Sequence, residues 1–436
     1  MEELEVKNQS DFMIEKMKER PINRRKLARR TVITAAMAVI FGLIACVTFL
    51  LLEPVISNWL YPAEEPAQVV FPEDVEEMAP EDMLSENLPS LDNPDQTSQI
   101  IFNKDDYSGI YAAMSDYVNE LNHSMVTVTG IQSNIDWFNN VEESKYQSSG
   151  VIIANNGQEL LVLVDYTPLR KAESMTMTFS YLSSTVNAQP EYQIPVTLKE
   201  QDSSTNLAVL SANLADVPVR LLEEGGITIA DLGSSNLANM TGKPVVAMGS
   251  PMGSSGSVGY GMITSITTQN KKADSNYKLL QTDIYGSQKA GGVLFNLEGK
   301  VIGVITNQNT GTDMKNVVSA YGISELKKRI EKMSNGERVA YAGISAVDVT
   351  EEAHEEQGVP RGAFIKDVEM NSPAMLAGIR QGDVLTTFGD KDILSYNDYI
   401  TALMQKDPGQ TIKLTVMRVS QGEYKEMEIS IVLDVQ

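Results

Sequence analysis

The sequence has 436 residues, of which 42% are hydrophobic and 21% are charged, so it is neither wholly disordered nor collagen-like. At about 150 residues per domain, the chain is long enough for two or three domains. Its net charge of -23, from 35 basic and 58 acidic residues, argues against nucleic acid as a partner, because phosphate binding requires a basic surface.

The first predicted element is a transmembrane helix at 31–52. This run, TVITAAMAVIFGLIACVTFLLL, contains no charged residue and no proline. A helix of this length spans about 33 Å, which is enough for a bilayer core of about 30 Å. The alternatives are a buried soluble helix or a cleaved signal peptide; the run is long for a signal core and lacks a small-x-small cleavage site.

The flanking charges predict the orientation of this helix. Five basic residues lie at 24–30, and the next basic residue after the run is Lys104. By the positive-inside rule, residues 1–30 form a cytoplasmic tail and everything beyond 52 is extracytoplasmic. The sequence therefore predicts a single-pass protein of the cell membrane.

An acidic, proline-rich linker is predicted at 53–104. Its residues 53–103 include twelve carboxylates, seven of the 17 prolines and no lysine or arginine. Like-charge repulsion and proline favour an extended, solvated spacer without a core. The alternative is an acidic docking site for a cation or a basic partner.

The region 105–333 is predicted to be mainly β. Helical spacing of apolar residues over 105–121 leads into a first strand at 125–129. Short β-branched runs between glycine, asparagine and serine turns follow, which is typical of an all-β barrel or sandwich. A helix at 324–333 closes the region, and Ser334-Asn335-Gly336 marks its boundary.

The remaining residues, 338–436, are predicted to form a smaller α+β domain. Strand patterns alternate there with two short helices, near 373–377 and 396–404.

Cysteine and histidine are too rare to form a metal site. The one cysteine, Cys46, excludes an internal disulfide and a cysteine-based zinc site. The two histidines, His123 and His354, lie far apart in the sequence. We therefore expect no metal and no cofactor.

Six short motifs follow one another in the 105–333 region. They are SGVII with NG at 149–157, TNLAVL at 205–210, VAMGSPMG at 246–253, GMITS at 261–265, QTD at 281–283, and GGVLFNLEGKVIGV at 291–304. With these motifs in this order, the region resembles the HtrA/DegP family of trypsin-like serine proteases. The resemblance implies a trypsin-like double β-barrel.

The same resemblance implies that the catalytic triad is lost. Ala290 stands at the nucleophile position before the Gly-Gly pair, and Asn206 stands where the family has the orienting aspartate. Depending on a one-residue gap, Val164 or Asp165 occupies the histidine position. Gln288 replaces the glycine of the oxyanion loop. No intact catalytic residue is expected.

The 338–436 region contains the string SPAMLAGIRQGDVL at 372–385. On this string, its most specific match, the region resembles the PDZ domain that follows HtrA-type proteases. The resemblance implies that Tyr341, Ala342, Gly343 and Ile344 form the loop that binds the carboxylate of a C-terminal peptide. The alternative is a domain that only packs on the barrel or mediates assembly.

These features together predict a membrane-anchored, extracytoplasmic HtrA-like pseudoprotease. Its expected role in envelope protein quality control is to bind unfolded proteins or C-terminal peptides, or to regulate an active relative. The resemblance also implies homo- or hetero-trimers. Two alternatives stay open: an active serine endopeptidase with non-standard catalytic residues, and an envelope scaffold that binds no peptide.

Overall fold

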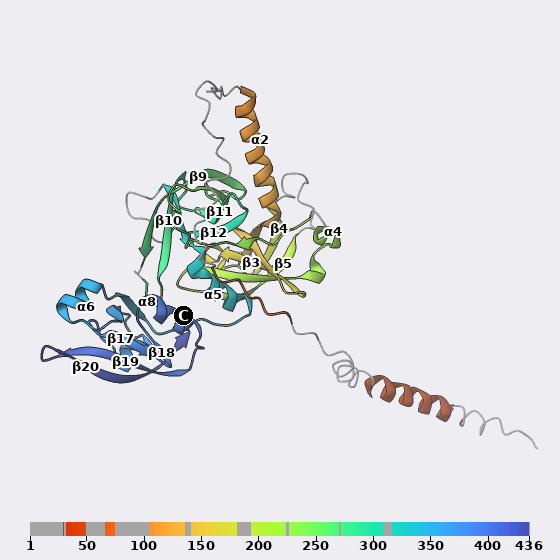
Figure 1. Ribbon diagram of the computed structural model, residues 1–436. Coiled ribbons are helices and arrows are strands. Elements are labelled where there is room, and N and C mark those ends of the chain that lie inside the picture. The colour runs from red at the N-terminus through yellow and green to blue at the C-terminus, as the bar shows by residue number, and fades with distance from the viewer. Residues whose placement is uncertain are drawn as a thin grey trace, which may run out of the picture. The chain divides into compact units, whose positions relative to one another are not determined.

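The structure is a computed structural model. It describes residues 29, 32–48, 66–74, 104–135, 141–180, 193–223, 226–269, 272–307 and 316–435. The chain divides into two units, residues 1–65 and residues 66–436, and each is described by itself. Figure 1 shows the elements of both units.

In the first unit, residues 32–48 are helical and their apolar side chains are exposed. No helix among the described residues is both long enough and apolar enough to cross a membrane. The predicted span 31–52 is therefore not supported as a transmembrane helix. Its residues 31 and 49–52 lie outside the described part of the chain.

A closed barrel forms the first half of the trypsin-like region, with strand order β1-β2-β3-β6-β5-β4. Its interior holds Val126, Ile152, Val162 and Leu210, which alternate with side chains facing the other way along their strands. The strands are β1 (Met125–Ile135), β2 (Val141–Asn155), β3 (Glu159–Asp165), β4 (Ser174–Phe179), β5 (Ile194–Asp202) and β6 (Leu207–Asn213).

The second half is a seven-stranded sheet with the order β11-β8-β9-β10-β13-β12-β7, and an additional pairing of β11 with β12 closes six of these strands into a ring. The prediction of a trypsin-like double β-barrel is confirmed. The strands are β7 (Asp231–Leu232), β8 (Pro244–Ser250), β9 (Ser257–Gln269), β10 (Tyr277–Tyr285), β11 (Gly291–Phe295), β12 (Lys300–Ile305) and β13 (Val317–Gly322).

Two longer helices frame the double barrel and confirm the helices predicted at 105–121 and 324–333. They are α2 (Lys104–Leu121) and α5 (Ile323–Ser334). Leu326, Ile330 and Met333 recur along α5 at helical spacing and are buried in the core between the barrels. Short helical turns lie between these elements: η1 (Asn122–Ser124) joins α2 to β1, and η2 (Thr167–Leu169), η4 (Leu214–Asp216) and α4 (Val219–Leu222) lie between strands.

Residues 66–74 depart from the solvated linker expected at 53–104. Val69 and Phe71 are buried in the same core as α5. The Phe71 N–H donates to the Glu331 carboxylate at 3.1 Å, and the Asp74 carboxylate forms an ion pair with Lys327 at 2.6 Å. The sequence analysis predicted a solvated linker from the acidic composition of the segment, and this prediction missed the two apolar side chains that the barrel domain buries.

The C-terminal domain is built on a six-stranded sheet with the order β15-β16-β17-β19-β20, in which β18 pairs with β17 off this path and β15 is an edge strand. The short helices predicted at 373–377 and 396–404 are confirmed as α7 and α8, whereas α6 was not predicted. The elements are β14 (Ala340–Tyr341), β15 (Ile344–Asp348), α6 (Glu351–Gln357), β16 (Ala363–Val368), α7 (Pro373–Ala377), β17 (Val384–Phe388), β18 (Lys391–Asp392), α8 (Tyr396–Met404), β19 (Thr411–Ser420), β20 (Glu423–Val432) and β21 (Asp434–Val435).

The caps of α7 and α8 explain why sequence placed both helices correctly. The Ser372 side chain accepts from the Met375 N–H at the start of α7, and Gly378 ends that helix in the left-handed conformation. Ser395 and Asp398 form a reciprocal capping box at the start of α8.

Candidate functional site

Residues predicted for all three triad positions line one cavity. Asp165 at the end of β3, Asn206 just before β6 and Ala290 just before β11 all line a cavity of about 860 Å³. These residues are far apart in the sequence, and the two barrels bring them together. The cavity thus brings together the residues that the resemblance assigns to the triad positions.

Asp165, rather than Val164, faces this cavity. Val164 is 2% exposed and belongs to the interior of the first barrel. Successive side chains of a strand point to opposite faces, so the next residue, Asp165, is directed out of the barrel interior. The sequence left Val164 and Asp165 as alternatives for the histidine position, and Asp165 is the one that lines the cavity with Asn206 and Ala290.

The polar groups at this place are engaged in local structure. The Asp165 carboxylate accepts from the Thr167 N–H at 2.8 Å, and the Asn206 side-chain oxygen accepts from the Arg170 guanidinium. The Asn206 backbone has a φ of 60°, a conformation that asparagine tolerates well. Neither side chain is positioned to orient a base.

No histidine lines the cavity. The chain has two histidines. The His123 ring lies against the carbonyl of Gly226, and the His354 Nδ1 lies 2.7 Å from the carbonyl oxygen of Val359. A serine-protease mechanism needs an imidazole or an equivalent base within hydrogen-bond reach of the nucleophile.

The loop before Ala290 satisfies its own backbone donors. The Ala290 N–H donates to the Ser287 carbonyl at 2.9 Å, and the Lys289 N–H donates to the Ser287 hydroxyl at 3.1 Å. The Ser287 N–H donates to the Pro251 carbonyl at 3.0 Å. In trypsin-like enzymes the N–H of the nucleophilic residue points at the oxyanion. Here that N–H, on Ala290, is already bonded within the loop.

One hydroxyl in the cavity escaped the sequence analysis as a candidate. Ser149 of β2 lines the cavity and is 5% exposed, and its Oγ has no hydrogen-bond partner among the described residues. A serine hydroxyl at its free pKa is a weak nucleophile without an adjacent base. No local signal distinguishes Ser149 from other strand serines, so sequence reasoning could not have selected it.

The predicted peptide-binding loop lies in the other domain. Tyr341, Ala342, Gly343 and Ile344 connect β14 to the edge strand β15. Gly343 has a φ of 87°, and an added Cβ would stand 2.2 Å from the Ser372 Cβ. Only glycine fits there, and its conformation directs successive N–H groups to one point.

The loop N–H groups converge on a carboxylate of the same chain. Those of Ala342 and Gly343 donate to Asp274 Oδ2, each at 2.7 Å, and that of Ile344 donates to Asp274 Oδ1 at 3.1 Å. Asp274 lies between β9 and β10 of the barrel domain. The loop therefore has the donor geometry expected of a carboxylate site.

Residues 148–304 match the family model of the trypsin-like peptidase domain, and residues 340–431 match the PDZ domain. The probable periplasmic serine endoprotease DegP-like of Rickettsia prowazekii is 28% identical over 330 residues, which cover 73% of this chain and 57% of that protein. The serine protease Do-like HtrA of Lactococcus lactis is 26% identical over 309 residues, which cover 65% of this chain and 70% of that protein.

The fold also matches a solved structure, the HtrA-type protease AlgW with decapeptide. The TM-score is 0.50 at 18% sequence identity, and the match covers 73% of this chain and 98% of that chain. This likeness supports the two-domain fold. The trimer implied by the resemblance stays a prediction.

Substitution of Gly343 tests the loop geometry. Gly343→Ala should destabilise the C-terminal domain through a strained φ, worth about 1–2 kcal/mol, and through overpacking against buried Ser372, worth about 1–3 kcal/mol. Gly378→Ala is the matched control, because Gly378 has a φ of 88° and no atom within 4 Å of an added Cβ. Calorimetry should show a larger fall in Tm for Gly343→Ala, and equal falls would contradict the packing argument.

Proposed function

We propose that this chain, a member of the HtrA-like family with a trypsin-like peptidase domain and a PDZ domain, binds peptides and has no peptidase activity. The observation that carries this proposal is Ala290 at the nucleophile position, with its N–H bonded to Ser287. The chain spans 57% and 70% of the two curated relatives given above, and both relatives are named as proteases.

The chemistry of the cavity supports a loss of catalysis. Asp165 cannot supply the imidazole that a serine nucleophile needs, and Asn206 carries no charge to orient a base. The side chain of Lys289 is exposed to solvent, whereas a lysine that serves as a base is buried. The Ser149 hydroxyl lines the cavity but has no hydrogen-bond partner among the described residues, so no base activates it as a nucleophile.

The PDZ domain supports peptide binding as the remaining activity. Its loop offers N–H groups from Ala342, Gly343 and Ile344 to a carboxylate, and β15 is an edge strand that can accept an added strand. A peptide with a free C-terminus fits both features. Binding unfolded or cleaved proteins, or presenting them to an active relative, is the role in envelope quality control that follows from this activity.

The first test is catalytic. The full chain should cleave neither casein nor an unfolded peptide pool, and Ala290→Ser should gain almost nothing, because the members of a triad act as a unit. A displaced oxyanion donor alone costs about 2.7–4 kcal/mol of transition-state stabilisation in other enzymes. An active HtrA protease is the positive control. Turnover by the wild-type chain, or labelling of Ser149 or Ser287 by a fluorophosphonate, would refute the proposal.

The second test concerns the peptide carboxylate. An array of decapeptides with apolar last residues should bind the full chain as free acids and lose affinity when amidated. Charge-assisted hydrogen bonds contribute about 1.5–3 kcal/mol each, so amidation should weaken binding about tenfold or more. Fluorescence anisotropy measures both forms. Equal binding of acid and amide would show that Tyr341–Ile344 is not the carboxylate site, and no binding of either form would favour a scaffold.

We also propose that the uncharged run at 31–52 anchors the protein with its C-terminal domains outside the cytoplasm. The proposal rests on the apolar composition of the run and on the basic residues at 24–30. Protease added to intact spheroplasts should remove a C-terminal tag and residues 66–436. Permeabilised spheroplasts are the control for accessibility, and protection of the tag in intact spheroplasts would contradict this topology.

A further inference from the structure

The carboxylate loop of the PDZ domain is filled by a residue of the barrel domain. Asp274 is 0% exposed. Its carboxylate accepts from the N–H groups of Ala342, Gly343 and Ile344, and the Tyr399 hydroxyl of α8 donates to Oδ1 at 2.6 Å. Every one of these donors belongs to the PDZ domain, while Asp274 is 68 residues from the nearest of them in sequence.

The main chain of Asp274 also pairs with the PDZ domain as a bound peptide would. Its N–H donates to the carbonyl of Ile344 at 2.8 Å, at the first residue of the edge strand β15. The Tyr396 hydroxyl of α8 donates to the same carbonyl at 2.9 Å and accepts from the Ser275 N–H at 3.2 Å. A terminal residue that adds to an edge strand would use these same groups, with its α-carboxylate where the Asp274 side chain lies.

We propose that Asp274 is an internal ligand that closes the PDZ peptide site, so that a peptide C-terminus binds only by displacing it. This inference rests on the proposed function, because it assumes that the loop serves peptides. It identifies the ligand class as chains with a free α-carboxylate. It also makes peptide binding and docking of the 272–276 segment mutually exclusive.

Burial of the docked Asp274 carboxylate destabilises its charged form, and this favours its displacement by a peptide. Burial raises the pKa of the Asp274 carboxyl, and the hydrogen bonds from the loop and from Tyr399 offset only part of that effect. Undocking returns the charge to water. A peptide would also continue along β15 beyond Ile344, and it would gain strand pairing that a single aspartate does not make.

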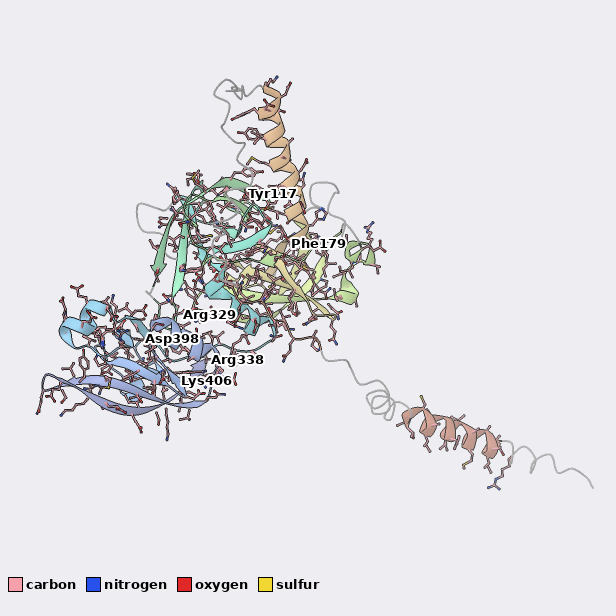
Figure 2. All side chains as sticks on the ribbon, in the orientation of Figure 1. Tyr117, Phe179, Arg329, Arg338, Asp398 and Lys406 are labelled. Carbon is pink, nitrogen blue, oxygen red and sulfur yellow. The ribbon has the colours of Figure 1, made fainter. Side chains whose placement is uncertain are left out.

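Displacement of Asp274 would also change contacts within the barrel domain. The Arg329 guanidinium of α5 donates to the carbonyl of Asp274 at 2.6 Å, and Figure 2 shows Arg329 on the side of the barrel domain that faces the PDZ domain. β10 begins three residues after Asp274 and leads to the loop before Ala290. By linkage, whatever stabilises the docked segment weakens peptide affinity by the same factor.

The test compares peptide affinity of the full chain with that of Asp274→Asn, which keeps the side-chain size and removes the charge. If the docked form holds about nine-tenths of the molecules or more, freeing the loop raises apparent affinity about tenfold or more. The probes are the free-acid and amidated decapeptide arrays. Both forms should gain affinity by the same factor, because both need the open loop, and the free acids should remain the tighter ligands.

Two further variants sharpen the comparison. Tyr399→Phe removes one donor to Asp274 without changing the packing volume, so it should raise acid affinity by less than Asp274→Asn does. Asp392→Asn removes the charge of an exposed carboxylate in the PDZ domain and should leave peptide affinity unchanged. Hydrogen exchange reports directly on docking, and the amides of 342–344 should exchange faster in Asp274→Asn.

The outcomes separate this inference from the proposed function. If wild type and Asp274→Asn bind free acids equally well, and both prefer acids to amides, Asp274 is not a competing ligand although peptide binding stands. If no variant binds any peptide while exchange at 342–344 accelerates in Asp274→Asn, the contact is a fixed domain interface. Peptide binding and the internal-ligand role would then both be wrong.

Discussion

A buried arginine of the barrel domain fixes the segment that contacts the PDZ loop. The Arg329 guanidinium lies 3.5 Å from the Asp202 carboxylate and 5.7 Å from the centroid of the Tyr277 ring, and it donates to the Asp274 carbonyl. A buried charge without partners costs several kcal/mol, so α5, β10 and the end of β5 must meet around it. This requirement fixes the backbone of Asp274 and presents its side chain to the PDZ loop.

The partner of this arginine, Asp202, also stabilises the turn beside the cavity of the predicted triad positions. Asp202 also accepts from the Ser204 hydroxyl at 2.8 Å and from the Thr205 hydroxyl at 2.7 Å. Thr205 precedes Asn206, and both line the cavity of the triad positions. Asp202 therefore holds the turn before β6 in place, which is a structural role. The buried Arg329–Asp202 pair thus also fixes the position of Asn206 at the cavity.

Sequence predicted the parts that local rules decide. The positions of α7 and α8 and the gathering of Asn206 and Ala290 followed from residue patterns and a family resemblance. The burial of Val69 and Phe71 and the contact of Asp274 with the PDZ loop did not, since each depends on a partner more than 60 residues away. Helix α6 was missed because its run of glutamates resembles a solvated loop, although the Thr350 cap starts a helix there.

Two sets of backbone donors that could bind a ligand are satisfied within this chain, but they differ in how they could be released. The Ala290 N–H is bonded to Ser287 in its own loop, and opening that loop would expose an oxyanion site with no nucleophile beside it. The donors at 342–344 are bonded to a carboxylate from another domain. Separating Asp274 from that loop yields a complete carboxylate site next to an unpaired strand edge. On the proposed function, a conformational change at the PDZ loop would therefore open a peptide site, whereas a change in the loop before Ala290 would supply no nucleophile.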